Sequence, residues 1–509
     1  MATDLDPDTR SAAAGGRPRA TTDSPPDAQR QRVAAVLVPL LLVAVTATLR
    51  LYLLDTPERI YFDETYYASD AVTLVDQGVE DGFVVHPQVG KWVIGAGVAL
   101  LGDGPLGWRA PAAVMGTATV LLTYLAGLRL FRRRGLAALA GLLVAVDGLA
   151  FTMSRIAMLD ATLAFFVVLG FWLLLIDRDR QWRALPTHTA PDPETDADRA
   201  TATALPRRGH AFRWLAGLAF GLALATKWSA LLPIGAAGLF VLGSDLAFRR
   251  RTTGRLLIAW PRIVASGVAT LVLLPAMVYL VGYASWFANY QLTRPGQERC
   301  EQGGPAVACD FAPTVMLSDW FGEQREIARF HADLETEHQY RATAWTWPLM
   351  LRPVAYYYEN CTPETQERRA EEGETCEVAP GNVAEILGMG NPLLWWMALA
   401  AYPVLLLGLA WRRDWAAAAI AVFLLGQYVP WLFASRPVFL FYVTPIVPFI
   451  ALAVAWAAGC AQRYRPLRWV PAAVALVAVS GFVYWYPVLV GMEISDEAWR
   501  LRMWSDRWI

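Results

Sequence analysis

The chain has 509 residues, of which 56% are hydrophobic, and its mean hydropathy is +0.33. That composition excludes an ordinary soluble protein, and the formal net charge of −1 excludes a strong overall attraction to nucleic acid or to an acidic partner. The 22 Trp and 18 Tyr residues suit a membrane protein, because amphipathic rings settle at the level of the lipid headgroups.

Residues 1–32 are polar and rich in Pro, Ser, Thr and Arg, which predicts a disordered cytoplasmic tail with no cleavable signal peptide. The first apolar run then begins and is long enough to cross the hydrocarbon core. Ten further apolar segments follow. The sequence therefore predicts an all-α polytopic membrane protein with spans near 33–54, 107–130, 135–151, 161–176, 214–226, 229–246, 257–281, 392–411, 415–433, 438–458 and 470–490.

Arginine clusters lie between these segments and predict the orientation of the chain. With eleven spans and a cytoplasmic N-terminus, every cluster falls on the cytoplasmic side, as the positive-inside rule requires. We expect an N-terminal transmembrane module over 33–281, which includes an outer loop at 55–106. A large outer loop over 282–391, a C-terminal module over 392–490 and an extracytoplasmic tail over 491–509 complete the predicted organisation.

Both outer loops have features of their own. The first contains an apolar stretch, residues 92–101, that is too short to span and is typical of an interfacial or re-entrant segment. The second holds four of the five cysteines, in a compartment that permits disulfides. Pairing of Cys300 with Cys309 and of Cys361 with Cys376 is the simplest of three possible connectivities.

Two adjacent carboxylates, Asp63 and Glu64, follow the first span and lie among aromatic residues. An acceptor hydroxyl has a pKa far above neutral, so glycosyl transfer to it benefits from a carboxylate that acts as general base. Partial desolvation by the neighbouring rings would raise the pKa of that carboxylate toward a useful range. An exposed acidic loop without catalytic function is the competing interpretation, and the spacing alone does not separate the two.

Lysine is rare in this chain. Of its 44 Lys and Arg residues only Lys91 and Lys227 are lysines, and each is followed by Trp, at Trp92 and Trp228. A lysine that anchors the chain at the interface is the plain interpretation. Because a compact ammonium also serves phosphate groups as a point charge, we favour phosphate recognition by both lysines.

Several charged residues fall at predicted membrane depth, where they are costly and are usually paired or functional. Arg155 and Asp160 could form an ion pair with each other, and they could also belong to a functional site, since the two interpretations are compatible. Asp147 lies within the third span. Arg436, at the turn between the ninth and tenth spans, is a candidate for an anionic lipid headgroup, and Arg109 opens the second span.

Two histidines of the large loop, His331 and His338, are seven residues apart and would share a face if that stretch were helical. They are too few for a metal site, and we interpret them as surface residues or acceptor contacts. The chain has no Walker loop, dinucleotide glycine fingerprint, HExxH or CxxC ligand set. The energy for any transfer must therefore be carried by the donor, and we expect no tightly bound cofactor and no metal.

Taken in order, these motifs resemble the protein O-mannosyltransferase family of the GT-C glycosyltransferases, in its actinobacterial form. The resemblance covers residues 33–490. It rests on Asp63-Glu64, His86-Pro-x-x-Gly-Lys91, Asp147-x6-Ser-Arg155-x4-Asp160, Lys227-Trp228-Ser229, 345–358 and 435–442. Gln88 stands where the family usually has a second proline, and the large loop lacks the β-trefoil module of eukaryotic members.

The resemblance implies a GT-C fold and an inverting transfer of mannose from a polyprenyl-phosphate donor to Ser or Thr hydroxyls of exported proteins. Asp63 would be the general base and Glu64 would support it, while Arg109 would meet the donor phosphate. Secondary phosphate or lipid contacts would come from Lys91, Lys227, Arg155 and Arg436, with support from Asp147, Asp160, His86 and Trp228.

The enzyme would lie in a bacterial plasma membrane, with the secretion translocon as a possible partner. Two alternatives remain. One is a GT-C enzyme that moves another polyprenyl-linked sugar to a glycan or lipid. The other is a transporter of lipid-linked sugar, which predicts inverted repeats and broken helices that the sequence does not show convincingly.

Overall fold

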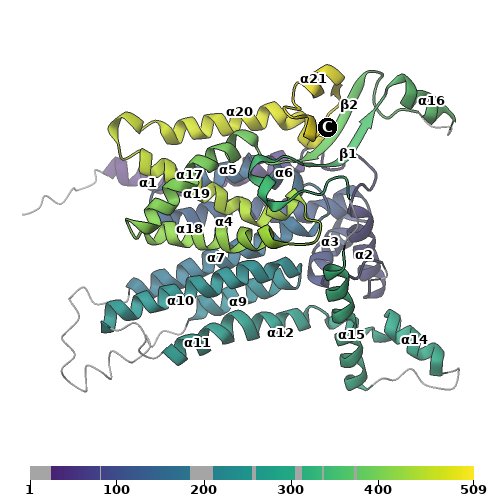
Figure 1. The fold of residues 1–509 in the computed structure, drawn as a ribbon, viewed down its shortest axis with the longest axis horizontal. Helices are drawn as coiled ribbons and strands as arrows, with labels where there is room; N and C mark the ends of the chain where they lie inside the picture. Colours follow the sequence, from purple (N-terminus) through teal and green to yellow (C-terminus); the bar gives the residue numbers. More distant parts are fainter. Residues whose placement is uncertain are drawn as a thin grey trace, which may run out of the picture.

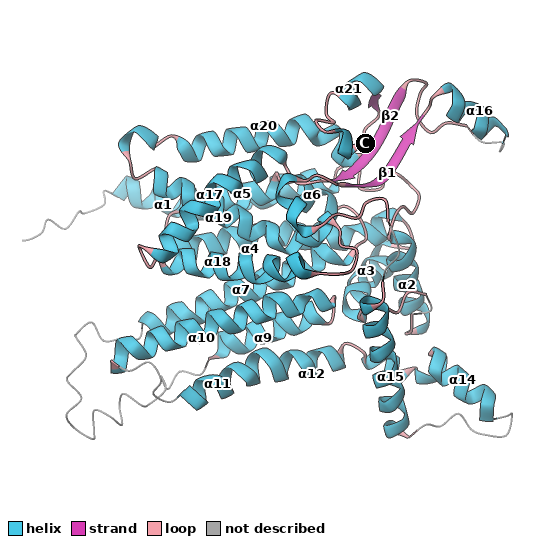
Figure 2. Ribbon diagram, in the orientation of Figure 1, coloured by secondary structure: helices cyan, strands magenta, loops and turns pink. Residues whose placement is uncertain are grey.

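A computed structural model of the chain describes residues 25–80, 82–183, 210–254, 260–303, 312–334, 338–371 and 375–509. Most of the tail expected over 1–32 and the polar loop at 184–209 lie outside the described residues. Long helices run side by side along one direction, and a small sheet and several short helices gather at one end of them (Figures 1 and 2).

The N-terminal half contributes nine helices of the described bundle. Pro105 and Pro275 sit in the first turns of their helices, where the missing N–H is not needed. A π-helical turn, Ala269–Leu273, joins the last two. The helices are α1 (Pro25–Leu51), α4 (Pro105–Phe131), α5 (Arg134–Ala145), α6 (Gly148–Met153), α7 (Leu159–Arg183), α9 (Ala211–Leu224), α10 (Leu231–Thr253), α11 (Trp260–Val268) and α12 (Leu274–Val281).

The C-terminal half adds α17 (Pro392–Ala410), α18 (Trp415–Tyr428), α19 (Val447–Ala461) and α20 (Val470–Val490). The core of the bundle lies along α7 and α19. The most apolar window of each span is 83% buried for Leu159–Arg183 and 89% buried for Leu440–Ala461. These two helices are apolar on all sides because other helices surround them, as expected for the centre of a membrane bundle.

Among the described residues, nine helices are long and apolar enough to cross a membrane, and each coincides with one of the expected spans. The remaining two expected spans, 135–151 and 214–226, correspond to shorter apolar helices, Arg134–Ala145 and Ala211–Leu224. The predicted polytopic, mostly helical architecture is confirmed, while the count of eleven crossings stays a prediction.

The expected outer loops carry short helices at one end of the bundle (Figure 1). The apolar stretch at 92–101 forms the second half of a 14-residue helix, α3, which packs against α2 and α4. The helices are α2 (Glu64–Gln77), α3 (Gln88–Leu101), α13 (Ala284–Ala288), α14 (Arg294–Gly303), α15 (Pro313–Ala332), α16 (Pro363–Glu371) and α21 (Asp496–Arg500).

A three-stranded antiparallel sheet, which the all-helical prediction lacks, lies at the same end. Its strands β1 (Val354–Asn360), β2 (Asn382–Gly388) and β3 (Ile494–Ser495) pair in that order. The excursion between β1 and β2 is closed by a disulfide between Cys361 and Cys376, which agrees with local pairing. Cys309, the expected partner of Cys300, lies outside the described residues.

The two ends of the chain differ in position. The start of α1 lies at one end of the bundle, and the C-terminus lies at the other, beside the sheet (Figure 1). The expected tail at 491–509 is an ordered part of the fold: the indole N–H of Trp499 donates to Glu385 (2.6 Å) and that of Trp508 donates to the Met350 carbonyl (2.8 Å). This arrangement is compatible with an odd number of crossings.

Candidate active site

A strained turn presents Asp63 at the start of α2. The preceding residue, Phe62, has a φ of +52°, a left-handed conformation that is costly for an aromatic residue. Its ring is held against Tyr356 of β1 (centroids 4.8 Å apart) and Phe441 (6.3 Å). Packing between two distant segments therefore fixes a backbone conformation that the local sequence would not adopt, and Asp63 follows directly after it.

The carboxylate of Asp63 is partly exposed, and no described residue donates a hydrogen bond to it. Burial of the surrounding region raises its pKa from the usual 3.8 to about 6. The positive charge of Lys227 opposes that rise and the negative charge of Asp160 adds to it. An unpartnered carboxylate with a pKa close to neutral is suited to accept a proton from an incoming group.

This pKa gives a first prediction. If Asp63 must be ionised to act, kcat/KM is expected to be constant above about pH 7 and to fall roughly tenfold per pH unit well below pH 6, because the carboxyl then holds its proton. The measurement is a pH–rate profile of the full-length protein at donor concentrations far below KM. A profile that stays flat down to pH 4.5 would contradict the assignment.

Glu64, the neighbour of Asp63, is fully buried and forms a bidentate ion pair with Arg109 of α4: Nε to Oε1 at 2.8 Å and Nη2 to Oε2 at 2.9 Å. The remaining N–H groups of Arg109 donate to the carbonyls of Leu54, Pro57 and Arg59. All five donors are thus directed to protein oxygens. This geometry does not support the expectation that Arg109 meets the donor phosphate. Instead, the ion pair between Glu64 and Arg109 holds the first outer loop against α4.

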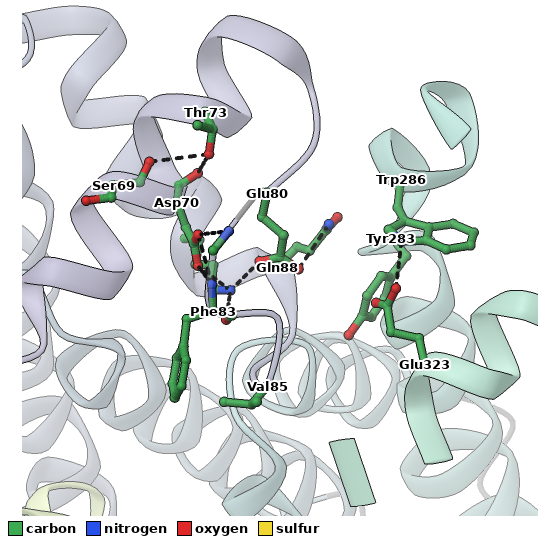
Figure 3. Close-up of polar contacts among 12 residues, drawn as sticks. Ser69, Asp70, Thr73, Glu80, Phe83, Val85, Gln88, Tyr283, Trp286 and Glu323 are labelled. Carbon is green, nitrogen blue, oxygen red and sulfur yellow. Dashed lines mark hydrogen bonds and ion pairs between the residues drawn. The ribbon is translucent and has the colours of Figure 1, made fainter. Parts of the chain in front are cut away.

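Lys91, like Arg109, interacts only with oxygen atoms of the protein among the described residues. Its ammonium is fully buried, forms ion pairs with Asp70 (2.9 Å) and Glu80, and donates to the Phe83 carbonyl at 2.6 Å. Figure 3 shows Asp70, Glu80 and Phe83 gathered around these contacts. Three donors meet three acceptors, so Lys91 has none left for a phosphate. We place it as a support of the loop between α2 and α3, in place of the phosphate contact favoured from sequence.

Two charged residues on either side of α6, Asp147 and Arg155, interact with the ends of helices. Arg155 donates to the carbonyls of Leu49, Arg50, Tyr52 and Leu53 at the end of α1, while Asp160 pairs with Lys227 instead. Asp147 accepts from the N–H of Ala150 as N-cap of α6, and also from the N–H of Asn391 and the indole of Trp395. Both roles are structural.

Lys227 pairs with Asp160, and together they lie within electrostatic reach of Asp63. The ammonium lies 3.0 and 2.9 Å from the two carboxylate oxygens and 5.0 Å from the centre of the Tyr442 ring. It borders a cavity of about 300 Å³ whose lining residues are His86, Lys227, Trp228, Ser229, Leu231, Leu232, His331, Pro430, Trp431, Ala434, Arg436 and Tyr442.

Arg436 is the other cation of this cavity. Among the described residues it forms no ion pair with a carboxylate, and its one hydrogen bond is to Nδ1 of His331 (2.9 Å). Its guanidinium lies near the rings of Tyr442 (5.7 Å) and Trp431 (6.0 Å). Of the five basic residues expected at the donor phosphate, the structure brings Lys227 and Arg436 to one cavity and uses the other three elsewhere.

The sequence analysis interprets His331 as a surface residue or acceptor contact, whereas the structure places it in the lining of this cavity. His331 enters it from α15, which ends at Ala332, so His331 and His338 do not share a helix face. His86 packs against the ring of His331 (5.3 Å), and the indole of Trp228 bonds Tyr279 at 2.8 Å. The sequence around His331 indicates a position near the cavity only by its aromatic residues, because the residues that His331 contacts lie far away in sequence.

No group of three or more His, Cys, Asp or Glu side chains in the described part of the chain is arranged to hold a metal ion. The expected lack of a metal and of a tightly bound cofactor remains a prediction.

Family models and curated relatives that match this chain are all protein mannosyltransferases. The sequence model for dolichyl-phosphate-mannose-protein mannosyltransferase matches residues 105–290, and that for the C-terminal four-helix membrane region of protein O-mannosyltransferase matches residues 316–508. A curated relative from Mycobacterium tuberculosis, named polyprenol-phosphate-mannose–protein mannosyltransferase, is 34% identical over 497 residues. The alignment covers 92% of this chain and 90% of the relative.

Two solved structures share the fold. The Saccharomyces cerevisiae Pmt1-Pmt2 complex bound to the sugar donor has a TM-score of 0.72 at 14% identity, covering 93% of this chain and 92% of that chain. ArnT from Cupriavidus metallidurans bound to undecaprenyl phosphate has a TM-score of 0.50 at 16% identity, covering 91% of this chain and 77% of that chain. The chain therefore has the GT-C architecture that both represent.

Proposed function

The chain belongs to the protein O-mannosyltransferase family, and on that premise we propose that it transfers mannose from polyprenyl-phosphate mannose to Ser or Thr hydroxyls of exported proteins. The observation that carries the assignment of the site is the pairing of an unpartnered carboxylate, Asp63, with a cavity that two cations border. The carboxylate of Asp63 can accept the proton of an incoming alcohol, and the two cations can bind the phosphate that departs.

The donor phosphate binds at Lys227 and Arg436. A polyprenyl phosphate combines an anionic head with an apolar tail, and the cavity offers both kinds of surface: two cations beside Trp228, Leu231, Leu232 and Trp431. Arg436 has donors that no described residue uses, so it can meet phosphate oxygens directly. Lys227, held by Asp160, adds positive charge beside them.

Transfer then takes place in one displacement. The acceptor oxygen forms a bond to the anomeric carbon of mannose while its proton passes to a carboxylate oxygen of Asp63. The bond from the anomeric carbon to the phosphate oxygen breaks, and the electron pair leaves with polyprenyl phosphate. Arg436 and Lys227 stabilise the negative charge that develops on that oxygen. Attack opposite the leaving group converts a β-linked donor into an α-mannoside.

The site lies at the outer face of a bacterial plasma membrane in this proposal. The arginine clusters between the expected spans favour a cytoplasmic N-terminus, and the end of the molecule that carries the C-terminus, opposite the start of α1, would then face out (Figure 1). Acceptors that emerge from the secretion translocon would meet the site there, which makes the translocon a candidate partner.

The direct test uses the full-length protein in lipid vesicles with radiolabelled polyprenyl-phosphate mannose and a Thr-rich peptide. We expect label on the peptide, and none on a matched peptide with every Thr and Ser replaced by Val and Ala. The same assay with a polyprenyl-phosphate arabinose or aminoarabinose donor examines the alternative GT-C activity. Transfer of those sugars without transfer of mannose would overturn the proposal.

The role of Lys227 gives a second prediction. Lys227→Arg keeps the charge, but a longer planar guanidinium cannot place one nitrogen between both oxygens of Asp160 in this nearly buried position. We expect kcat/KM to fall about 10- to 100-fold, the scale of one lost charge-assisted hydrogen bond. The assay is peptide mannosylation at equal protein level. Unchanged activity would return Lys227 to the role of an interfacial anchor.

A further inference from the structure

His331 links the large outer loop to the proposed donor site. It lies in the last turn of α15, which belongs to the large outer loop. Its ring contacts residues of three other segments: Val85 and His86 of the first outer loop, Trp228 before α10, and Arg436. A side chain with so many partners from distant parts of the chain is well placed to set their relative positions.

The two hydrogen bonds of His331 fix its protonation form. Arg436 can only donate, so Nδ1 of His331 must accept from its guanidinium at 2.9 Å. The Val85 carbonyl can only accept, so Nε2 must carry the proton that is donated to it at 3.0 Å. The ring is therefore the neutral Nε2–H tautomer. Burial and the charge of Arg436 act in the same sense, because they lower the pKa of His331 from 6.5 to about 4.

Arg436 depends on this acceptor for its orientation. No described carboxylate or carbonyl accepts a hydrogen bond from its guanidinium, and the nearby Trp431 and Tyr442 rings restrain it without choosing the direction of its N–H groups. The hydrogen bond that one N–H of Arg436 donates to His331 fixes the plane of the guanidinium group. The donors that remain are then available to the cavity that both residues line.

We propose that His331 is a positioning residue that orients Arg436 for the donor phosphate, so that α15 of the large outer loop controls donor binding. The inference rests on the proposed function, because it presumes that Arg436 meets the phosphate. The position of α15 is itself secured by two contacts near its middle, about two turns before His331. The indole of Trp286 donates to Glu323 at 3.0 Å, and the Tyr279 hydroxyl donates to Gln324 at 2.5 Å.

The test compares steady-state kinetics of four single variants and one double variant with the full-length wild type, varying polyprenyl-phosphate mannose and peptide separately. His331→Ala is expected to raise KM for the donor about tenfold, the effect of one charge-assisted hydrogen bond, with KM for the peptide within twofold. His331→Gln should recover most of the donor affinity, because its amide oxygen can accept from Arg436. Arg329→Ala, an exposed residue on the same turn of α15, is the matched control and should behave as wild type.

The fourth variant separates the two proposals. Arg436→Ala should raise the donor KM by at least as much, and adding His331→Ala to it should change the donor KM no further. If Arg436→Ala leaves the donor KM unchanged, the proposed phosphate site is wrong and the role of His331 falls with it. If Arg436→Ala has its effect but His331→Ala does not, or if the two effects multiply, only the positioning role of His331 is overturned.

Discussion

Replacement of Asp63 by Asn is expected to reduce peptide mannosylation about 100- to 10,000-fold, the usual contribution of a general base. Asn keeps the size of the side chain but cannot take a proton from the acceptor hydroxyl. No described residue hydrogen-bonds the Asp63 carboxylate, so the change removes no structural contact. We therefore expect normal protein level and normal thermal stability, and an unchanged affinity for polyprenyl-phosphate mannose.

The control for this variant is Asp76→Asn, an exposed carboxylate on the same helix. It should retain full activity. The measurement is the initial rate of label transfer at saturating donor and peptide, in vesicles that contain equal amounts of each protein. Asp63→Asn with more than half of the wild-type rate would remove Asp63 as the base and leave the cavity without an identified acceptor of the proton.

Replacement of Glu64 by Gln is expected to destabilise the protein by about 3–5 kcal/mol, because it leaves the fully buried Arg109 without its counter-charge. The same carboxylate also accepts from the N–H of Ala157 at 2.9 Å, so the variant loosens the contact between the first outer loop and the start of α7 as well. The loss should appear as a lower midpoint of thermal inactivation in detergent, together with a lower protein level in membranes.

Glu58→Gln is the matched control, since Glu58 is exposed in the same loop, and it should leave thermal inactivation unchanged. Together with Asp63→Asn, the pair of variants assigns separate roles to two adjacent carboxylates. A Glu64→Gln protein with normal stability and a raised donor KM would indicate that Arg109 meets the phosphate after all, as the family resemblance implied.

The transmembrane architecture could be predicted because it depends on a property of single segments. The long apolar runs at 392–411 and 470–490, for example, form α17 (Pro392–Ala410) and α20 (Val470–Val490), close to their expected bounds. Hydrocarbon thickness sets the required length, and no knowledge of neighbours is needed. The sheet was missed for the opposite reason. The paired strands β2 and β3 are more than 100 residues apart in sequence, and β3 has only two residues.

The residue types at the site could also be predicted, but their partners could not. Sequence identifies Lys91 and Lys227 as equally unusual, yet Asp70, Glu80 and a carbonyl surround the first while the second borders a cavity. Which carboxylates face a given cation depends on how α2, α3 and α7 cross in space. The same limit applies to Arg109, whose five acceptors all come from the loop that precedes α2 or from Glu64.

The strand β3 has a consequence for how the molecule is made. Asp63 is synthesised early, but the strand that packs on Phe62 belongs to a sheet whose last member follows α20, almost at the end of the chain. Nearly the whole chain must therefore be translated before β3 can pair with β2 and complete the sheet beside the first outer loop. The membrane helices that precede β3 in the chain can therefore be made before the sheet is complete, because only β3 has to be added to the β1–β2 pair from the far end of the sequence.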